Sequence, residues 1–287
     1  MSPFLVWWLA IRPKTLSLAL SPVLVGNSLA WADMRSLHWG VAAATLAAAL
    51  LIQIGTNLYN DAADHERGTD GADRLGPRRA TAQGWLTAAQ VKRGAAVSFG
   101  SAFLLGIYLA AVGGWPIVTL GLASLAAGYA YTGGSKPIAY SASGELFVFL
   151  FFGVFAVTGS HYLQTLTLSG AAATAGAALG LLAAAVLTVN NYRDLDSDRR
   201  AGRLTLCHWL GRERARWLYA LLLLAPFLLI LHPATAPWPL LPALPFALLL
   251  VYRFYREPPG VGLNRLLAAT ARFQLAFGLL LSFGYLT

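Results

Sequence analysis

The stretch from Gln53 to Gln83 decides the fold and reads QIGTNLYNDAADHERGTDGADRLGPRRATAQ. It begins inside a long apolar segment, and its first polar residues recur at intervals of three and four: Gln53, Asn57, Asn60, Asp61 and Asp64. Residues at these intervals share one face of a helix, so the stretch predicts a helix with a single polar stripe. The helix is expected to end at Gly68, and a loop rich in Asp and Arg follows it.

A second stretch of the same kind runs from Asn190 to Arg203 and reads NNYRDLDSDRRAGR. Asn190, Asp194 and Asp198 repeat every four residues, again where an apolar segment ends. The chain therefore carries two acidic clusters, each at the end of a hydrophobic helix, and the rest of the fold is expected to hold them together.

The composition excludes an ordinary soluble protein. Of the 287 residues, 57% are hydrophobic and only 11% are charged, whereas about a quarter of the residues of a soluble protein are charged. Apolar runs recur that approach the roughly 20 residues a helix needs to cross a bilayer. A segment in lipid must satisfy its own backbone hydrogen bonds, so we expect an all-α membrane protein.

Nine transmembrane helices are predicted, forming one domain over residues 1–287 as a bundle around a central cavity. The expected spans are about 15–32, 39–60, 88–111, 115–132, 142–160, 169–191, 213–231, 237–255 and 267–286. Two cytoplasmic active-site loops are expected at 61–87 and 193–212.

The distribution of charge predicts the topology. With nine spans, all of the 21 Lys and Arg residues except Arg35 fall on one side of the membrane. Positive residues mark the cytoplasmic side, so the N-terminus is expected there and the C-terminus outside. This asymmetry also explains the net charge of +9 without a nucleic-acid partner.

The acidic residues need another explanation, since carboxylates contribute little to topology. All of the 12 Asp and Glu residues except Asp33 fall on the same side as the basic residues. Asp side chains at a membrane boundary are expected to face a wet cavity, and two facing clusters would make a strongly negative pocket. Their oxygen ligands suit Mg²⁺ shared with substrate phosphates, and the neighbouring Arg and Lys residues suit a diphosphate. The simpler alternative is that these residues form solvated helix ends and a topology signal.

The two clusters resemble the paired motifs of the UbiA-type intramembrane aromatic prenyltransferases. They read NDAAD at 60–64 and DLDSD at 194–198, after the expected second and sixth spans. RPKTL at 12–16, YTGGSKP at 131–137 and GSHYLQ at 159–164 add to the resemblance, which covers Arg12 to Arg216 and fades over the last three spans. The pattern is most similar to the branch that prenylates 1,4-dihydroxy-2-naphthoate. Gly68 stands where the 4-hydroxybenzoate branch usually has a third Asp, and Asp70 is expected to take its role.

The resemblance implies a site and a reaction. Mg²⁺ is expected on Asn60, Asp61, Asp64, Asp70, Asp194 and Asp198. The diphosphate is expected on Asn60, Arg74, Lys136, Arg199 and Arg203. The implied catalytic residues are Asp64, Asp70, Asp194 and Lys136. A polyprenyl diphosphate would prenylate 1,4-dihydroxy-2-naphthoate with loss of CO₂ and diphosphate, giving a demethylmenaquinone, in the bacterial cytoplasmic (inner) membrane. The isoprenoid tail is expected along Phe147, Phe149, Phe151 and Phe152.

Other functions stay open at this point. A prenyltransferase of the same type could use 4-hydroxybenzoate, homogentisate, a porphyrin or a lipid glycerol as its acceptor. A transporter of cations or organic ions is the alternative from a different class, although transporters usually place such acids near the bilayer midplane. The sequence pattern carries no information on prenyl chain length or oligomeric state.

Overall fold

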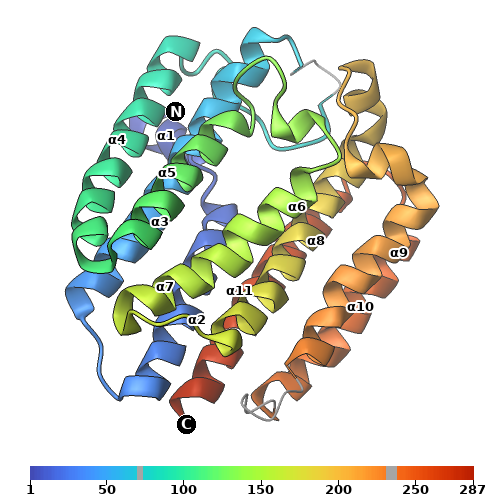
Figure 1. The fold of residues 1–287 in the computed structure, drawn as a ribbon. Helices are drawn as coiled ribbons and strands as arrows, with labels where there is room; N and C mark the ends of the chain where they lie inside the picture. The colour runs from blue at the N-terminus through green and yellow to red at the C-terminus, as the bar shows by residue number, and fades with distance from the viewer. Residues whose placement is uncertain (70–73, 231–237) are drawn as a thin grey trace.

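The computed structural model describes residues 1–69, 74–230 and 238–287, and within these ranges the chain forms only helices and their connections (Figure 1). The prediction of an all-α protein is therefore confirmed. The main helices are α1 (Pro3–Ala10), α2 (Pro13–Met34), α3 (Trp39–Glu66), α4 (Ala88–Gly113), α5 (Trp115–Ala130), α6 (Gly144–Phe149), α7 (Phe155–Thr165), α8 (Gly170–Arg200), α9 (Leu206–Leu229), α10 (Leu244–Arg256) and α11 (Leu263–Leu286). A π turn, η2 (Leu150–Val154), joins α6 and α7, and two short 3₁₀ turns are η1 (Ile138–Tyr140) and η3 (Trp238–Ala243).

Every predicted span overlaps a helix, and six helical segments of the described chain are long and apolar enough to cross a membrane. These are α2, α3, α4, the continuous segment α6–η2–α7, α8 and α11. α5 is apolar but has only 16 residues, and α10 has 13. The first part of α9 carries the charged run RERAR at 212–216, and Gly211 (φ 72°) interrupts its helical backbone.

The helices that carry the acidic motifs continue beyond the predicted membrane spans. α3 ends at Glu66, close to the expected helix end at Gly68, and α8 continues to Arg200, so Asp61, Asp64, Asp194 and Asp198 stand on regular helix. The predicted loops at 61–87 and 193–212 therefore begin later, after Glu66 and Arg200. Arg199 and Arg200 in the last turn of α8 favour this extension, because cations stabilise a helix C-terminus.

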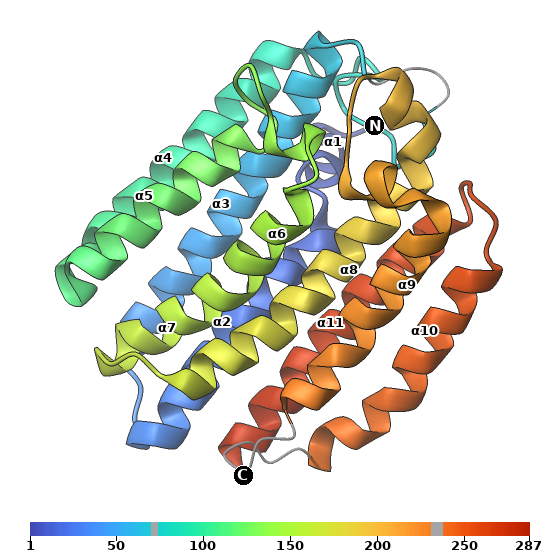
Figure 2. The ribbon, with the colours of Figure 1, turned by 45° about the vertical axis from the view of Figure 1, so that its right-hand side comes forward.

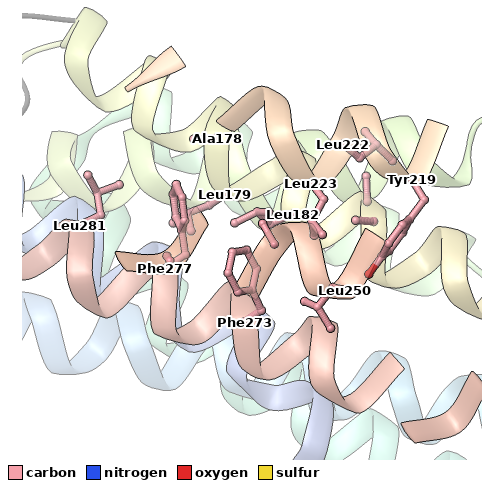
Figure 3. Close-up of a cluster of buried hydrophobic side chains, with 14 of the residues drawn as sticks. Ala178, Leu179, Leu182, Tyr219, Leu222, Leu223, Leu250, Phe273, Phe277 and Leu281 are labelled. Atoms are coloured by element: carbon pink, nitrogen blue, oxygen red, sulfur yellow. The ribbon is translucent and has the colours of Figure 1, made fainter. Parts of the chain in front are cut away.

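α8 is the central helix of the bundle, and it is buried over most of its length. One side packs against α9 and α11 in the largest core cluster, where Leu179 and Leu182 meet Leu223 of α9 and Phe273 and Phe277 of α11 (Figure 3). Alanine residues at 172, 175, 178, 183, 184 and 185 leave little side chain between α8 and its neighbours. Small residues let helix backbones approach closely, so α8 can contact several helices at once.

On the opposite side of α8, glycine residues form its contact with η2. A Cβ atom on Gly153 would lie 2.3 Å from the Cα atom of Gly180, and one on Gly176 would lie 2.8 Å from the Cα atom of Val154. The two helix backbones are therefore in direct contact at the π turn. This contact fixes the wall of the bundle that carries Phe147, Phe151 and Phe155 of α6, η2 and α7.

The two termini lie at opposite ends of the bundle, and the N-terminal end also holds the ends of α3 and α8 that carry the acidic motifs (Figures 1 and 2). At the other end, polar side chains join the helices, and most of them are buried. His161 Nε2 lies 2.8 Å from a carboxylate oxygen of Asp33. Gln164 hydrogen-bonds to Asn27 and to the backbone of His38, which joins α7 to α2 and to the start of α3. The acidic motifs and these structural hydrogen bonds therefore lie at opposite ends of the bundle.

The substitution Gly153→Ala is expected to lower the thermal stability of the purified protein in detergent by about 1–3 kcal/mol, because the added methyl group overlaps backbone atoms of α8. Gly100→Ala on α4 is the matched control, since nothing lies within 4 Å of a Cβ atom there. A thermal unfolding curve measures both. Equal midpoints for the two variants would contradict the proposed backbone contact.

A candidate active site at the N-terminal end of the bundle

A cavity of about 1290 Å³ lies inside the bundle, polar at one end and apolar over the rest. Its polar lining comes from the ends of α3 and α8, from the loop after α3, and from the start of α2 and of α11. The polar residues include Arg12, Gln53, Asn57, Asn60, Arg74, Arg78, Arg79, Asn190, Asn191, Arg193, Asp194, Asp198, Arg203 and Asn264. The predicted central cavity is therefore present, and residues of both acidic motifs line it.

Asp64 of the first motif is fully buried between two guanidinium groups. Its Oδ2 atom accepts a hydrogen bond from Arg79 Nη2 at 2.6 Å, and its Oδ1 atom accepts one from Arg203 Nη2 at 2.5 Å. The hydroxyl of Tyr140 lies 3.3 Å from the same Oδ1 atom. A carboxylate with two cationic donors stays ionised, because both interactions favour the charged form.

Arg203 joins the two motifs. Its Nη2 atom also donates to Thr69 Oγ1 at 2.8 Å, and its Nη1 atom lies 3.8 Å from an oxygen of Asp198 in the second motif. Burial disfavours the charge on Arg203, but the carboxylates of Asp64 and Asp198 outweigh it, so the pKa of Arg203 lies above its ordinary value. The predicted meeting of the two clusters is thus brought about by a shared arginine.

Asp61 faces away from the cavity and binds the returning loop. Its carboxylate accepts hydrogen bonds from the backbone N–H groups of Ala80 at 2.9 Å and Thr81 at 3.2 Å, and from the Thr81 hydroxyl. The Asp61 side chain is 1% exposed and does not line the cavity. In this conformation Asp61 fixes the loop that delivers Arg79 to Asp64.

Asp194 of the second motif lines the cavity and is paired with its own neighbour. Arg193 donates to both Asp194 oxygens, at 2.8 and 2.5 Å, and also to Asn190 and to Asn264 of α11. Asn264 in turn donates to the backbone carbonyl of Leu75 at 2.8 Å. This network joins the loop after α3 to α8 and α11.

The expected strongly negative pocket is not what these contacts produce. Asp64 is paired with Arg79 and Arg203, and Asp194 with Arg193, while Asp61 is engaged by backbone donors. The cavity end therefore combines carboxylates with guanidinium groups that pair with them, and it suits an anion as well as a cation.

Arg12 is a site residue that the sequence reasoning did not select. It stands between α1 and α2 in a left-handed backbone conformation (φ 56°, ψ 64°) and lines the cavity. Its Nη2 atom is buried and has no hydrogen-bond partner in the described chain. Burial, together with the nearby charges of Arg79 and Arg74, lowers the pKa of Arg12 to about 9. A cation with an unused donor beside a cavity is a ready site for an anionic group.

The structure separates the predicted site residues into groups. Five line the cavity: Asn60, Arg74, Asp194, Asp198 and Arg203. Asp61 and Asp64 are buried behind that lining. Lys136 and Arg199 are exposed and do not line the cavity. Asp70 lies outside the described residues.

The position of Lys136 follows from how its loop is held. Arg67 Nη1 donates a hydrogen bond to the backbone carbonyl of Thr132. Arg67 Nη2 donates one to the backbone carbonyl of Gly134 at 2.8 Å. Gly134 has a positive φ of 75°, which turns the chain outward before Lys136. Tyr140, which follows in η1, is the residue of this segment that reaches the acidic motifs instead.

Three of the four phenylalanine residues that were predicted to lie along the isoprenoid tail line the apolar part of the cavity. Phe147, Phe151 and Phe152 line it, together with Phe155. Phe149 does not, since its ring lies against Gly180 of α8 on the other side of the helix.

The oxygen atoms at the cavity end fit a magnesium ion that shares its coordination with a substrate. Among the described residues, no three Asp, Glu, His or Cys side chains are arranged to hold a metal ion by themselves. Asn60, Asp194 and Asp198 nevertheless carry hard oxygen ligands and line one end of the cavity, where Arg79 donates to the Asn60 amide oxygen and Arg193 to both Asp194 oxygens. Mg²⁺ usually takes one or two carboxylates and completes its shell with water and phosphate, and this donor set suits that arrangement.

Two further residues of the site, Arg193 and Tyr140, were missed because their role is tertiary. They are ordinary members of the runs NNYRD and PIAYS, with no helical spacing to mark them. Arg79 was counted only among the basic residues that suit a diphosphate, and its pairing with Asp64 was not predicted. Arg12 could have been selected from the sequence, because it lies in RPKTL, one of the motifs that carry the family resemblance.

The substitution Asp61→Ala is expected to destabilise the protein by about 3 kcal/mol, since it leaves buried N–H groups of the loop without an acceptor. It should also speed tryptic cleavage at 74–79. Asp196→Ala is the control, because Asp196 is exposed and its ion pair with Arg212 is expected to contribute little. Thermal unfolding and timed proteolysis measure both effects, and an unchanged Asp61→Ala variant would refute the anchoring role.

Comparison with known proteins agrees with this site. Residues 19–277 match the model of the UbiA prenyltransferase family. The chain is 37% identical to the 1,4-dihydroxy-2-naphthoate octaprenyltransferase of Escherichia coli, over 97% of this chain and 94% of that protein. It is 32% identical to the enzyme of the same name from Bacillus subtilis, over 98% of this chain and 92% of that protein.

The fold has a counterpart among solved structures. A UbiA homologue from Archaeoglobus fulgidus, bound to GPP and Mg²⁺, superposes with a TM-score of 0.69 at 16% identity, covering 98% of this chain and 99% of that chain. The family match covers most of the chain and includes both acidic motifs. The chain belongs to the UbiA prenyltransferase family.

Proposed function

We propose that this chain transfers a polyprenyl group from a polyprenyl diphosphate to 1,4-dihydroxy-2-naphthoate, with loss of CO₂ and diphosphate, to give a demethylmenaquinone. The observation that carries the chemistry is that both acidic motifs meet, through Arg203, at the polar end of a large apolar cavity. The choice of acceptor is supported by the relatives named above, which are 32% and 37% identical over nearly the whole chain.

The polar end suits the diphosphate. Arg12 offers an unused donor, and Arg74 and Arg203 line the same region. Guanidinium groups bind phosphate oxygens with charge-assisted hydrogen bonds, which are roughly twice as strong as neutral ones. These groups would stabilise the negative charge that develops on the diphosphate as the allylic C–O bond breaks.

A bound Mg²⁺ would supply further neutralisation of the departing diphosphate. We propose Asn60, Asp194 and Asp198 as the side chains that hold it, because these residues line the cavity. The ion would take the place of Arg79 at the Asn60 amide oxygen and of Arg193 at Asp194. Asp64, Asp61 and Asp70 complete the set expected from the motifs. A metal ion could reach Asp64 only if Arg79 or Arg203 moved, since these two guanidinium groups cover its oxygens.

The apolar part of the cavity suits the isoprenoid tail and the reacting carbon. The rings of Phe147, Phe151 and Phe152 line it. An apolar chamber keeps water from the allylic cation, so the electron-rich ring of the acceptor is the nucleophile within reach.

We further propose that all nine predicted spans cross the bacterial cytoplasmic membrane, with the N-terminus and the site on the cytoplasmic side. The support is the position of the basic residues: all but Arg35 of the 21 fall, in a nine-span count, on the side of the acidic motifs. α9 and α10 pack together at one edge of the bundle, and the exposed side chains of Leu221, Leu228 and Phe246 suit contact with lipid.

The purified protein with Mg²⁺, a polyprenyl diphosphate and 1,4-dihydroxy-2-naphthoate is expected to give a prenylated, decarboxylated product by mass spectrometry. The same reaction with 4-hydroxybenzoate should give none. Asp194→Asn should remain folded, because it keeps a hydrogen-bond acceptor for the buried Arg193, and its rate should fall at least a hundredfold, because it removes the carboxylate charge from the cavity lining. Product from 4-hydroxybenzoate alone would overturn the acceptor, and full activity of Asp194→Asn would overturn the site.

Arg12→Leu is expected to lower kcat/KM for the prenyl diphosphate by roughly 10- to 100-fold, the loss of one charge-assisted hydrogen bond. Its thermal stability should not fall, because the substitution removes a buried guanidinium nitrogen that has no partner. Arg93→Leu on the exposed face of α4 is the matched control. Steady-state kinetics with both substrates varied separate the two variants, and equal values for them would remove Arg12 from the site.

A further inference from the structure

Glu145, at the start of α6, is a buried acid that the proposed reaction does not use. The residue is 5% exposed. Its Oε1 atom accepts a hydrogen bond from Asn191 Nδ2 at 2.9 Å, and its Oε2 atom has no hydrogen-bond partner in the described chain. Burying a carboxyl group costs free energy unless the group forms hydrogen bonds. The hydrogen bond to Asn191 is therefore the interaction to explain.

Asn191 connects this acid to the cavity. Its side chain is 7% exposed and belongs to the cavity lining, whereas Glu145 does not. The bond to Glu145 uses an N–H of the amide and thereby fixes the orientation of the group. The amide oxygen makes no hydrogen bond with another described residue, so it is available to a ligand in the cavity.

The position of Asn191 suits the acceptor better than the diphosphate. It stands three residues before Asp194 on α8, about 4.5 Å deeper along the helix axis than the acidic motif. Asn190 beside it is taken up by Arg193, and the lining residues one turn deeper are apolar, such as Leu187 of α8 and Val148 of α6. An amide oxygen carries partial negative charge and accepts hydrogen bonds, so it repels phosphate oxygens and binds hydroxyl groups.

The supporting wall is rigid. The start of α6 packs directly on α8, where a Cβ atom on Gly144 would lie 3.4 Å from Leu187. Glu145 therefore approaches Asn191 from a fixed helix rather than from a loop. Side chains on helices hold the orientation of a binding group, such as the Asn191 amide, more precisely than side chains on loops.

We propose that Glu145 is a positioning residue, which orients the amide of Asn191 so that its oxygen accepts a hydrogen bond from a ring hydroxyl of the aromatic acceptor. This inference rests on the proposed function in one respect, that the acceptor substrate is an aromatic compound with a ring hydroxyl. The bond would hold the electron-rich ring one helical turn below the diphosphate, beside the allylic carbon.

Three single variants and one double variant test this role by kinetics in which acceptor and prenyl diphosphate are varied separately. Glu145→Leu and Asn191→Leu are expected to raise KM for the acceptor about tenfold, the loss of one hydrogen bond, and to leave KM for the prenyl diphosphate within about twofold. Glu145→Gln keeps an acceptor oxygen for Asn191 and should restore the wild-type KM. The double variant should be no worse than either leucine variant, because both remove the same interaction.

Several results would overturn the proposal. One is an equal rise in KM for both substrates, which indicates general damage to the cavity. A second is a Glu145→Gln variant as impaired as Glu145→Leu, which indicates that the acid itself is required. A third is additive loss in the double variant. Because the assay can be run with whichever hydroxylated aromatic the wild-type protein prenylates, a wrong assignment of 1,4-dihydroxy-2-naphthoate leaves this test intact.

Discussion

The buried carboxylate of Asp64 is the interaction on which the rest of the site depends. It lies where the end of α3, the returning loop and the segment after α8 come together, and it accepts hydrogen bonds from Arg79 and Arg203. Removing one partner of a buried ion pair leaves an uncompensated charge and costs about 3–5 kcal/mol, so the three groups hold one another in place. Through Arg203 this arrangement reaches Asp198, and the polar end of the cavity becomes one connected unit.

Charge matching explains how so many ionisable groups can stand at the end of a membrane bundle. Asp194 has Arg193 and Asp64 has two arginines, while Asp61 is held by backbone donors. The arginines that neutralise these acids are also the groups that can bind a diphosphate. A substrate and its metal ion would therefore exchange partners with an existing network instead of entering an empty, repulsive pocket. Arg12, which has an unused donor, is the exception within this balance.

The apolar frame gives this network a fixed geometry. α8 carries the second motif and packs against α9 and α11 through the leucine and phenylalanine cluster of Figure 3. On its other side it touches η2 through Gly153 and Gly180. The same helix presents Asn191, Asp194 and Asp198 to the cavity, one turn apart. Packing at the far side of α8 thus sets the positions of side chains at the site.

The sequence by itself determined the fold class, the approximate helices and the two helix ends that carry the chemistry, because apolar length and helical spacing are local properties. Of the residues that the motifs and the family resemblance singled out, five line one cavity in the structure: Asn60, Arg74, Asp194, Asp198 and Arg203. Only the tertiary structure decided that Asp61 binds a loop, that Lys136 points outward, that Arg79 pairs with Asp64, and that Arg12, Arg193 and Tyr140 belong to the site. Those roles depend on which segments distant in the chain come within a few ångströms, and no periodicity in a single sequence records that.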